Sequence, residues 1–263
     1  MQAQRLPILA GWQWIRMGWI LFRTQPAVLF TWTMMISLGL ILAMLIAPIG
    51  PMIFITLVPT ITFLTLTACR RIHNGERPVF SEWFKPLKEK ALFGKLLRLG
   101  GLYMAISLLA ALVAFLPFHT ELSMALQSLD EAQDLTQFSQ ILNKPVMIFT
   151  VLYFILAALF WYAPVLVGWH GIAVTRSLFY SAVACWRNKW SLALYALIWF
   201  GIFNAVDVIF GVIANLVSLQ VAAVLQVPAN LFVASVLYCS FYPTYITVFR
   251  SIRKQDIDNE NDE

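Results

Sequence analysis

Long and nearly charge-free apolar stretches alternate along the chain with short segments that carry most of the Lys and Arg residues. A helix needs about 20 residues to cross a hydrocarbon core of about 30 Å. Six stretches meet this length, at residues 27–48, 51–69, 99–118, 146–169, 191–214 and 229–249. The pattern predicts an all-α polytopic membrane protein that forms a single domain over residues 1–255.

The segment before the first apolar stretch has a helical period of its own. Arg5, Arg16 and Arg23 are spaced by 11 and 7 residues. At about 100° per residue they fall within about 20° of one line on a helix. The remaining surface is rich in Trp, Ile and Phe. An arginine stripe on an aromatic helix is typical of a helix that lies in the membrane interface.

The same plan occurs three times along the chain. Segment 171–189 again carries two arginines 11 residues apart, and segment 81–95 is a more basic counterpart. The second span of each pair also contains a proline, which frees a carbonyl and bends a membrane helix. These prolines are Pro59, Pro164 and Pro243. We predict three helical hairpins with kinked helices around a shared centre, each hairpin preceded by a cytoplasmic interfacial amphipathic helix.

The distribution of charge predicts the orientation of these hairpins. Lys and Arg in short loops are retained on the cytoplasmic side. With the N-terminus inside, all but one of the 18 Lys and Arg residues lie there, and the exception is Lys144. We therefore expect both termini in the cytoplasm. The net charge of +5 then describes a basic inner face suited to anionic lipid head groups, not to nucleic acid. Residues 256–263 are expected to form an acidic disordered tail.

Three segments of the chain resemble an uncharacterised family of proteobacterial inner-membrane proteins of about this length. They are RTQPAVLF, RRIHNGERP and FWYAPVLVGWHGIAVTRSLFYSAVACWRNKW. The resemblance covers most of the chain and departs in segment 120–144. The fold also looks similar to the membrane domain attached to some glycerophosphodiester phosphodiesterases, without their catalytic domain. The resemblance implies the bacterial inner membrane as the location, and it implies no activity and no functional residues.

Catalytic motifs are missing from the sequence. It contains no G-x-S-x-G, no H-E-x-x-H, no Walker A loop and no dinucleotide fingerprint. Two histidines on the predicted inner side, His73 and His170, would need a carboxylate beside them to form a metal or catalytic site. We predict a protein that is not an enzyme and that binds neither a metal nor a cofactor.

The segment RRIHNGERP lies just beyond a predicted span and carries four basic or histidine side chains. They are Arg70, Arg71, His73 and Arg77. Convergent cations of this kind capture a phosphate from a lipid or a ligand. The same residues also fit a stop-transfer anchor that ends in an Asn-Gly turn. The sequence leaves both interpretations open.

One carboxylate, Asp207, interrupts the fifth apolar stretch. A charge near mid-bilayer costs about 2.5 kcal/mol or more, so an acid there marks a functional site by default. A helix that starts at Ser191 and rises about 1.5 Å per residue carries Asp207 about 24 Å across the membrane. We expect a structural clamp near the outer end, made with Asn204 and Lys144. A proton- or cation-coupled transport site is the alternative.

The functional prediction is a non-enzymatic inner-membrane protein that organises or regulates a membrane-protein partner or a lipid through its basic inner face. The alternative is a small transporter or lipid-handling protein with a path between the kinked helices near Asp207. A continuous polar cavity along such a path would distinguish the two functions.

Overall fold

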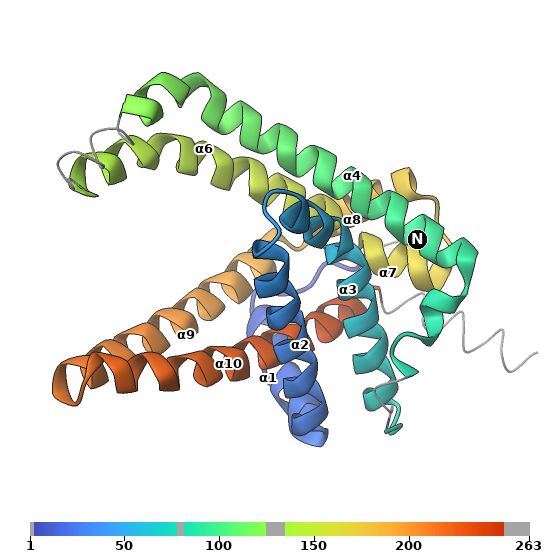
Figure 1. Cartoon of the computed structure of the whole chain (residues 1–263). Helices are drawn as coiled ribbons and strands as arrows, with labels where there is room; N and C mark the ends of the chain where they lie inside the picture. The colour runs from blue at the N-terminus through green and yellow to red at the C-terminus, as the bar shows by residue number, and fades with distance from the viewer. Residues whose placement is uncertain (1–2, 78–81, 125–134, 250–263) are drawn as a thin grey trace, which may run out of the picture.

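The computed structural model describes residues 3–77, 82–124 and 135–249, and its regular elements there are helices (Figure 1). They are α1 (Ala10–Thr24), α2 (Pro26–Met44), α3 (Ile49–His73), the 3-10 helix η2 (Lys85–Lys88), α4 (Lys90–Phe115), the 3-10 helix η3 (Leu116–Phe118), α6 (Leu135–Phe160), α7 (Ala163–His170), α8 (Val174–Arg187), α9 (Lys189–Leu216) and α10 (Leu219–Val248). Six helical stretches are long and apolar enough to cross a membrane, as the hydropathy pattern predicts. The predicted tail, 256–263, lies outside the described residues.

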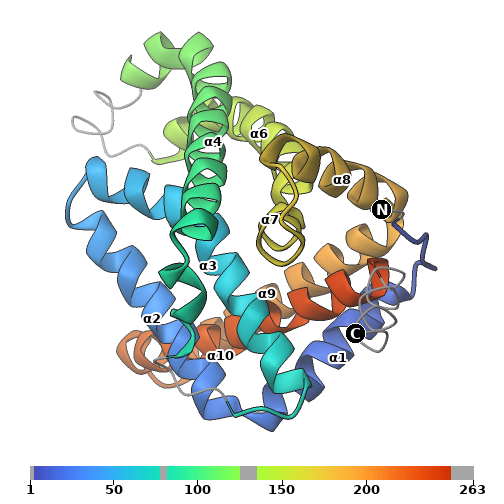
Figure 2. The ribbon, with the colours of Figure 1, turned by 90° about the vertical axis from the view of Figure 1, so that its right-hand side faces the viewer.

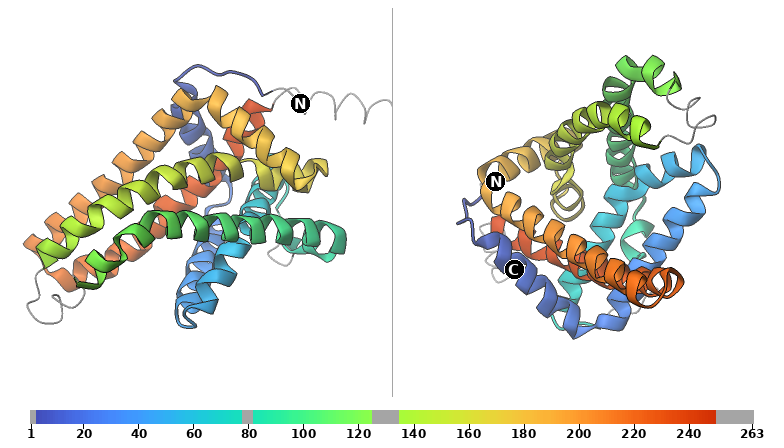
Figure 3. Two further views of the ribbon diagram at one scale, coloured as in Figure 1. Left: turned by 90° about the horizontal axis from the view of Figure 1, so that it is seen from above. Right: turned by 90° about the vertical axis from the view of Figure 1, so that its left-hand side faces the viewer.

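The long helices lie side by side in consecutive pairs: α2 with α3, α4 with α6, and α9 with α10 (Figures 1 and 2). The α4–α6 and α9–α10 pairs spread apart toward one side of the molecule (Figure 3). Their other ends converge on α1, α7 and α8. We call the converging ends the basic end, because Arg23, Arg71, Lys85 and Arg187 lie there, and the opposite ends the distal end. These two pairs are therefore far apart at the distal end.

Helix α1 approaches α9 and α10 closely through two glycines. A Cβ atom on Gly18 would lie 2.6 Å from the Cα of Ser240, and one on Gly11 would lie 2.5 Å from the carbonyl oxygen of Ser191. Contacts this short exclude any side chain, so only glycine permits the two helix axes to come this near. The spacing of Gly11 and Gly18 places both on one face of α1.

The aromatic surface predicted for segment 5–23 is divided between buried and exposed side chains. Trp14 and Phe22 are buried against the bundle, whereas Trp12 and Trp19 are exposed. Helix α1 packs on α9 and α10. Some of its aromatic side chains therefore belong to the core, and the others lie on the surface. Only part of the aromatic surface is left exposed.

The fourth predicted span is interrupted. Helix α6 ends at Phe160, and α7 begins at Ala163 with Pro164 in its first turn. The missing N–H of proline costs no helical hydrogen bond in that position. Pro164 therefore begins a helix, in contrast to the predicted kink, whereas Pro59 and Pro243 lie inside α3 and α10.

Segment 81–95 is not one amphipathic helix. Its described part consists of η2 and the first turns of α4, which begins at Lys90, earlier than the hydropathy pattern predicts. Leu96 and Leu99 are fully buried and continue the packed face of α4 between Lys and Arg residues. Charged side chains lower the hydropathy of this stretch although its inner face is core, so the predicted boundary comes too late.

One buried asparagine holds the segment that precedes α1. The side-chain oxygen of Asn188 accepts a hydrogen bond from the Leu6 N–H at 2.9 Å, and its amide nitrogen donates to the carbonyls of Gln4 and Ala184 at 2.9 and 3.0 Å. Asn188 separates α8 from α9 and is only 2% exposed. The start of the chain is thereby fixed to the junction of two helices far along the sequence.

Candidate functional site

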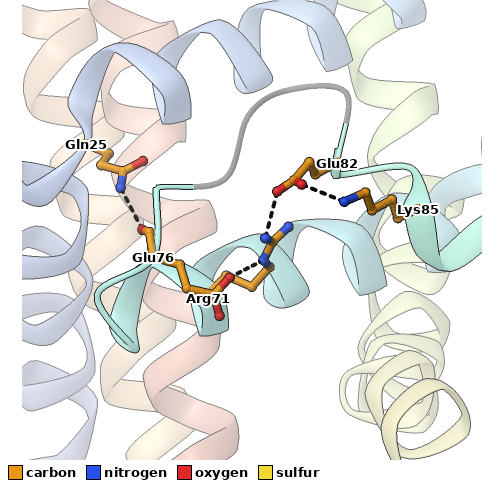
Figure 4. A network of polar contacts seen from close by, with 5 residues as sticks. All are labelled: Gln25, Arg71, Glu76, Glu82 and Lys85. Atoms are coloured by element: carbon orange, nitrogen blue, oxygen red, sulfur yellow. Dashed lines mark hydrogen bonds and ion pairs between the residues drawn. The ribbon is translucent and has the colours of Figure 1, made fainter.

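A network of charged side chains joins the end of α3 to η2 at the basic end (Figure 4). Arg71 contacts two carboxylates: its Nε lies 2.7 Å from Glu76 Oε2, and its Nη2 lies 2.7 Å from Glu82 Oε2. Glu82 also pairs with Lys85. Hydrogen bonds from Lys85 and Arg71 lower the pKa of the Glu82 carboxyl. The guanidinium of Arg71, a predicted phosphate ligand, is therefore already paired with two carboxylates.

Arg70 and His73 belong to a second group, built around aromatic rings. The guanidinium of Arg70 lies 5.0 Å from the ring centre of Trp169, a favourable cation–π distance. The His73 ring centre is 5.5 Å from that of Tyr242. His170 shares a short hydrogen bond of 2.6 Å with the Tyr245 hydroxyl. The two inner histidines thus each contact a tyrosine of α10.

The four side chains that were predicted to bind a phosphate therefore do not converge on one site. Arg71 lies in the carboxylate network, Arg70 and His73 lie in the aromatic group, and Arg77 is exposed next to a gap in the described residues. Across the described ranges, no group of three or more His, Cys, Asp or Glu side chains could hold a metal ion. Two lysines of η2 could still bind a phosphate. Lys88 is exposed, and the Lys85 side chain is 61% exposed despite its contact with Glu82.

An apolar groove of about 390 Å³ runs between α2 and α3. Its lining consists of Trp32, Met35, Ile36, Gly39, Leu42, Ala43, Ile46, Gly50, Ile53, Phe54, Leu57, Ile61 and Phe84. At the basic end the ring of Trp32 packs against Trp83 and Phe84, with centres 4.6 and 6.0 Å apart. Lys85 follows directly. The groove is therefore apolar along its length, and its lining includes Phe84, the residue before Lys85.

The groove is not apparent from the sequence, because nothing there shows that Trp83 and Phe84 would lie beside α2. The available signal was a set of small residues in the first hairpin. Gly50 approaches the Ala43 carbonyl so closely that a Cβ atom would lie 2.0 Å from it. Gly39 is different, because a Cβ atom there would meet only a Phe54 ring carbon at 3.8 Å. Its missing side chain leaves space in the groove.

A smaller cavity of about 170 Å³ lies where α3, α4, α6, α7 and α10 meet. Pro59 and Pro164 line it, and Pro243 precedes a lining residue. Hydroxyl groups form part of its wall, from Thr62, Tyr103, Tyr153, Tyr162 and Thr244. The Tyr162 hydroxyl lies beside Thr244, yet no hydrogen bond of normal geometry satisfies it among the described residues. The cavity offers neutral polar groups and no charge.

Asp207 lies on an exposed face of α9, and its contacts differ from the predicted clamp. Its Oδ1 accepts a hydrogen bond of 2.8 Å from Gln226 Nε2 on α10. Asn204 instead donates to the Phe200 carbonyl of its own helix. None of the ion pairs between described residues involves Lys144. Gln226 could have been found from the sequence, because it and Asp207 lie almost equally far from the turn between α9 and α10.

The six apolar helices, the groove that opens along two of them and the basic end define a polytopic membrane protein. Over 256 residues the chain is 32% identical to a Burkholderia thailandensis protein described as a probable inner membrane protein, and the match covers 93% of each chain. The chain belongs to this family of inner-membrane proteins. No protein-family model matches it, and no solved structure matches it.

Proposed function

We propose that this protein is a non-enzymatic organiser of the inner membrane that binds an anionic phospholipid at its basic end. The observation that carries the proposal is the α2–α3 groove, which is lined by apolar side chains including Phe84, the residue before the exposed Lys85. One acyl chain would lie in the groove, and the lipid phosphate would contact Lys85 and Lys88. We also propose that the fold is similar to the membrane domain of some glycerophosphodiester phosphodiesterases. Only the resemblance in sequence supports this part of the proposal.

The dimensions and chemistry of the groove suit this ligand. From Trp32 to Ile46, at about 1.5 Å per residue, it extends for about 21 Å, more than half of a hydrocarbon core of about 30 Å. Aromatic rings such as those of Trp32 and Phe84 favour the boundary between hydrocarbon and head groups. Lysine side chains reach from such a boundary toward phosphates while their stems pack on apolar surface.

Blocking either half of this site should reduce phospholipid binding. Gly39→Leu places a side chain in the groove without meeting backbone, and Lys85→Gln with Lys88→Gln removes two cations. Each basic residue near an anionic surface contributes about 1 kcal/mol. The double glutamine variant should therefore bind an anionic phospholipid about 30-fold more weakly. Native mass spectrometry of the protein titrated with phosphatidylglycerol in detergent measures this change.

The matched control is Gly201→Leu, because a side chain at Gly201 on α9 would enter open space. It should bind phosphatidylglycerol like the unaltered protein. Phosphatidylethanolamine, which has the same chains and no net charge, should bind all forms weakly. Equal retention of phosphatidylglycerol by the Gly39→Leu and Gly201→Leu proteins would contradict the groove as the binding site.

The proposal places the basic end in the cytoplasm, with the helix pairs crossing the membrane as three hairpins and with α1 and α8 along the inner surface. The retention of Lys and Arg on that side supports this orientation. A cysteine at Lys88 should resist an impermeant thiol reagent in intact spheroplasts, and one at Ser123 should react. Both positions are exposed, and the three native cysteines are buried. The reverse labelling would contradict the orientation.

Transport is the second candidate function. The cavity of about 170 Å³ between α3, α4, α6, α7 and α10 favours it. Two of the three prolines line that cavity, together with hydroxyl groups that a neutral solute could bind. Asp207 does not line it, so a path would run past the prolines and not past Asp207. Transport requires the cavity to open alternately to both sides. A cysteine at Ala157, which lines the cavity, would then react with impermeant reagents applied from either side of the membrane.

A further inference from the structure

Two opposite charges lie exposed on different helix pairs toward the distal end. Asp207 is exposed on α9 and accepts a hydrogen bond only from Gln226 among the described residues. Lys144 is exposed on α6, and the ion pairs of the described residues do not include it. The two pairs of helices diverge toward this end (Figures 1 and 3). One chain therefore carries both partners of an ion pair and keeps them apart.

The two charges lie at similar distances along their helices from a common level. The ring centres of Trp161 and Tyr195 are 6.3 Å apart, which gives the two pairs of helices a common level. At about 1.5 Å per residue, Lys144 lies about 25 Å beyond this level and Asp207 about 18 Å beyond it. A lysine side chain spans the difference of about 7 Å by extending along the helix surface.

The face of α9 around Asp207 carries several small and polar residues beside the exposed ring of Phe200. Asn204, Gly211 and Asn215 lie within about 80° of Asp207 by their helical spacing, and all are exposed. The amide nitrogens of Asn204 and Asn215 donate to carbonyls of their own helix. Small and polar residues of this kind are typical of contacts between membrane helices. A carboxylate exposed to hydrocarbon costs about 2.5 kcal/mol or more.

We propose that two copies of this chain associate through these faces, with Lys144 of each copy paired to Asp207 of the other. A two-fold axis makes the two ion pairs equivalent and satisfies both charges of both chains. The second copy is the partner that the observations favour, because each chain supplies the acid and the base in equal number. The inference is independent of the phospholipid site at the basic end.

Crosslinking between differently tagged copies tests the contact. One copy carries Lys144→Cys and the other carries Asp207→Cys, and the three native cysteines are buried. A bis-maleimide reagent added to the membranes should join the two tagged chains, because a Lys–Asp contact leaves the two Cα atoms beyond the reach of a direct disulfide. The double variant, Lys144→Cys with Asp207→Cys in one chain, should form only crosslinks between chains. Either a crosslink within that chain or no crosslink between tagged chains would overturn the proposal.

Charge reversal provides the second measurement. The dimer dissociation constant in liposomes should rise at least tenfold for Asp207→Lys and for Lys144→Asp, and it should return to within about threefold of the unaltered value when both are combined. Lys95→Asp, an exposed reversal on α4 near the basic end, should leave it unchanged. Thermal unfolding in detergent verifies that each variant is folded. Failure of the combined variant to recover dimers, with all variants folded, would overturn the proposal.

Discussion

Replacing Gly100 with alanine should destabilise the protein by about 3 kcal/mol, the upper range for overpacking a core. A Cβ atom on Gly100 would lie 1.9 Å from the carbonyl oxygen of Thr56 and 2.9 Å from its carbonyl carbon. Both atoms belong to the backbone of α3, which cannot rotate away as a side chain can. The two helices would have to separate, and the packing of α4 on α3 would be lost along several turns.

The adjacent glycine provides the matched control. A Cβ atom on Gly101 would meet nothing within 4 Å, and alanine favours a helix over glycine by about 1 kcal/mol. Gly101→Ala should therefore be neutral or slightly stabilising. Reversible unfolding in mixed micelles, measured for both variants, compares the two residues in one helix. Equal destabilisation by the two substitutions would contradict the close contact between α3 and α4.

Asn188→Ala should cost about 2 to 4 kcal/mol of folding free energy. The substitution leaves the Leu6 N–H and the Gln4 carbonyl without their side-chain partner. Both bonds are part-buried, so each lost partner costs about 1 to 2 kcal/mol, the lower part of the range for a buried group. The segment before α1 should also become accessible to protease at the basic end. Melting temperature and limited proteolysis in detergent measure the two effects together.

Two further variants test whether the effect of Asn188→Ala comes from the hydrogen bonds of this side chain. Asn188→Asp keeps the acceptor for Leu6 but loses the donor for Gln4, so it should be intermediate in stability. Asn215→Ala removes an exposed amide that bonds only to the Gly211 carbonyl of its own helix, and it should change the folding free energy by less than about 0.5 kcal/mol. An unaltered cleavage pattern in Asn188→Ala would show that other contacts hold the segment.

The sequence by itself determined the class of protein and its six apolar helices, because transfer of apolar residues to lipid depends on composition and length and not on distant contacts. It also singled out Asp207 as a charge within an apolar helix. The boundary of α4 could not be predicted in the same way. Its first turns bury Leu96 and Leu99 against the bundle while carrying charge on the other side, which a hydropathy pattern averages together.

Only the tertiary structure decided which partners the polar residues have. Arg71 meets Glu82 because the segment just before η2 folds back toward the end of α3. Asp207 meets Gln226 while remaining apart from Lys144 because the helix pairs diverge. The groove between α2 and α3 exists because Gly39 leaves space and Phe84 reaches its end from another segment. Hydrogen bonds and close contacts depend on distances of a few ångströms between residues far apart in the chain, and such distances are fixed only when the helices pack.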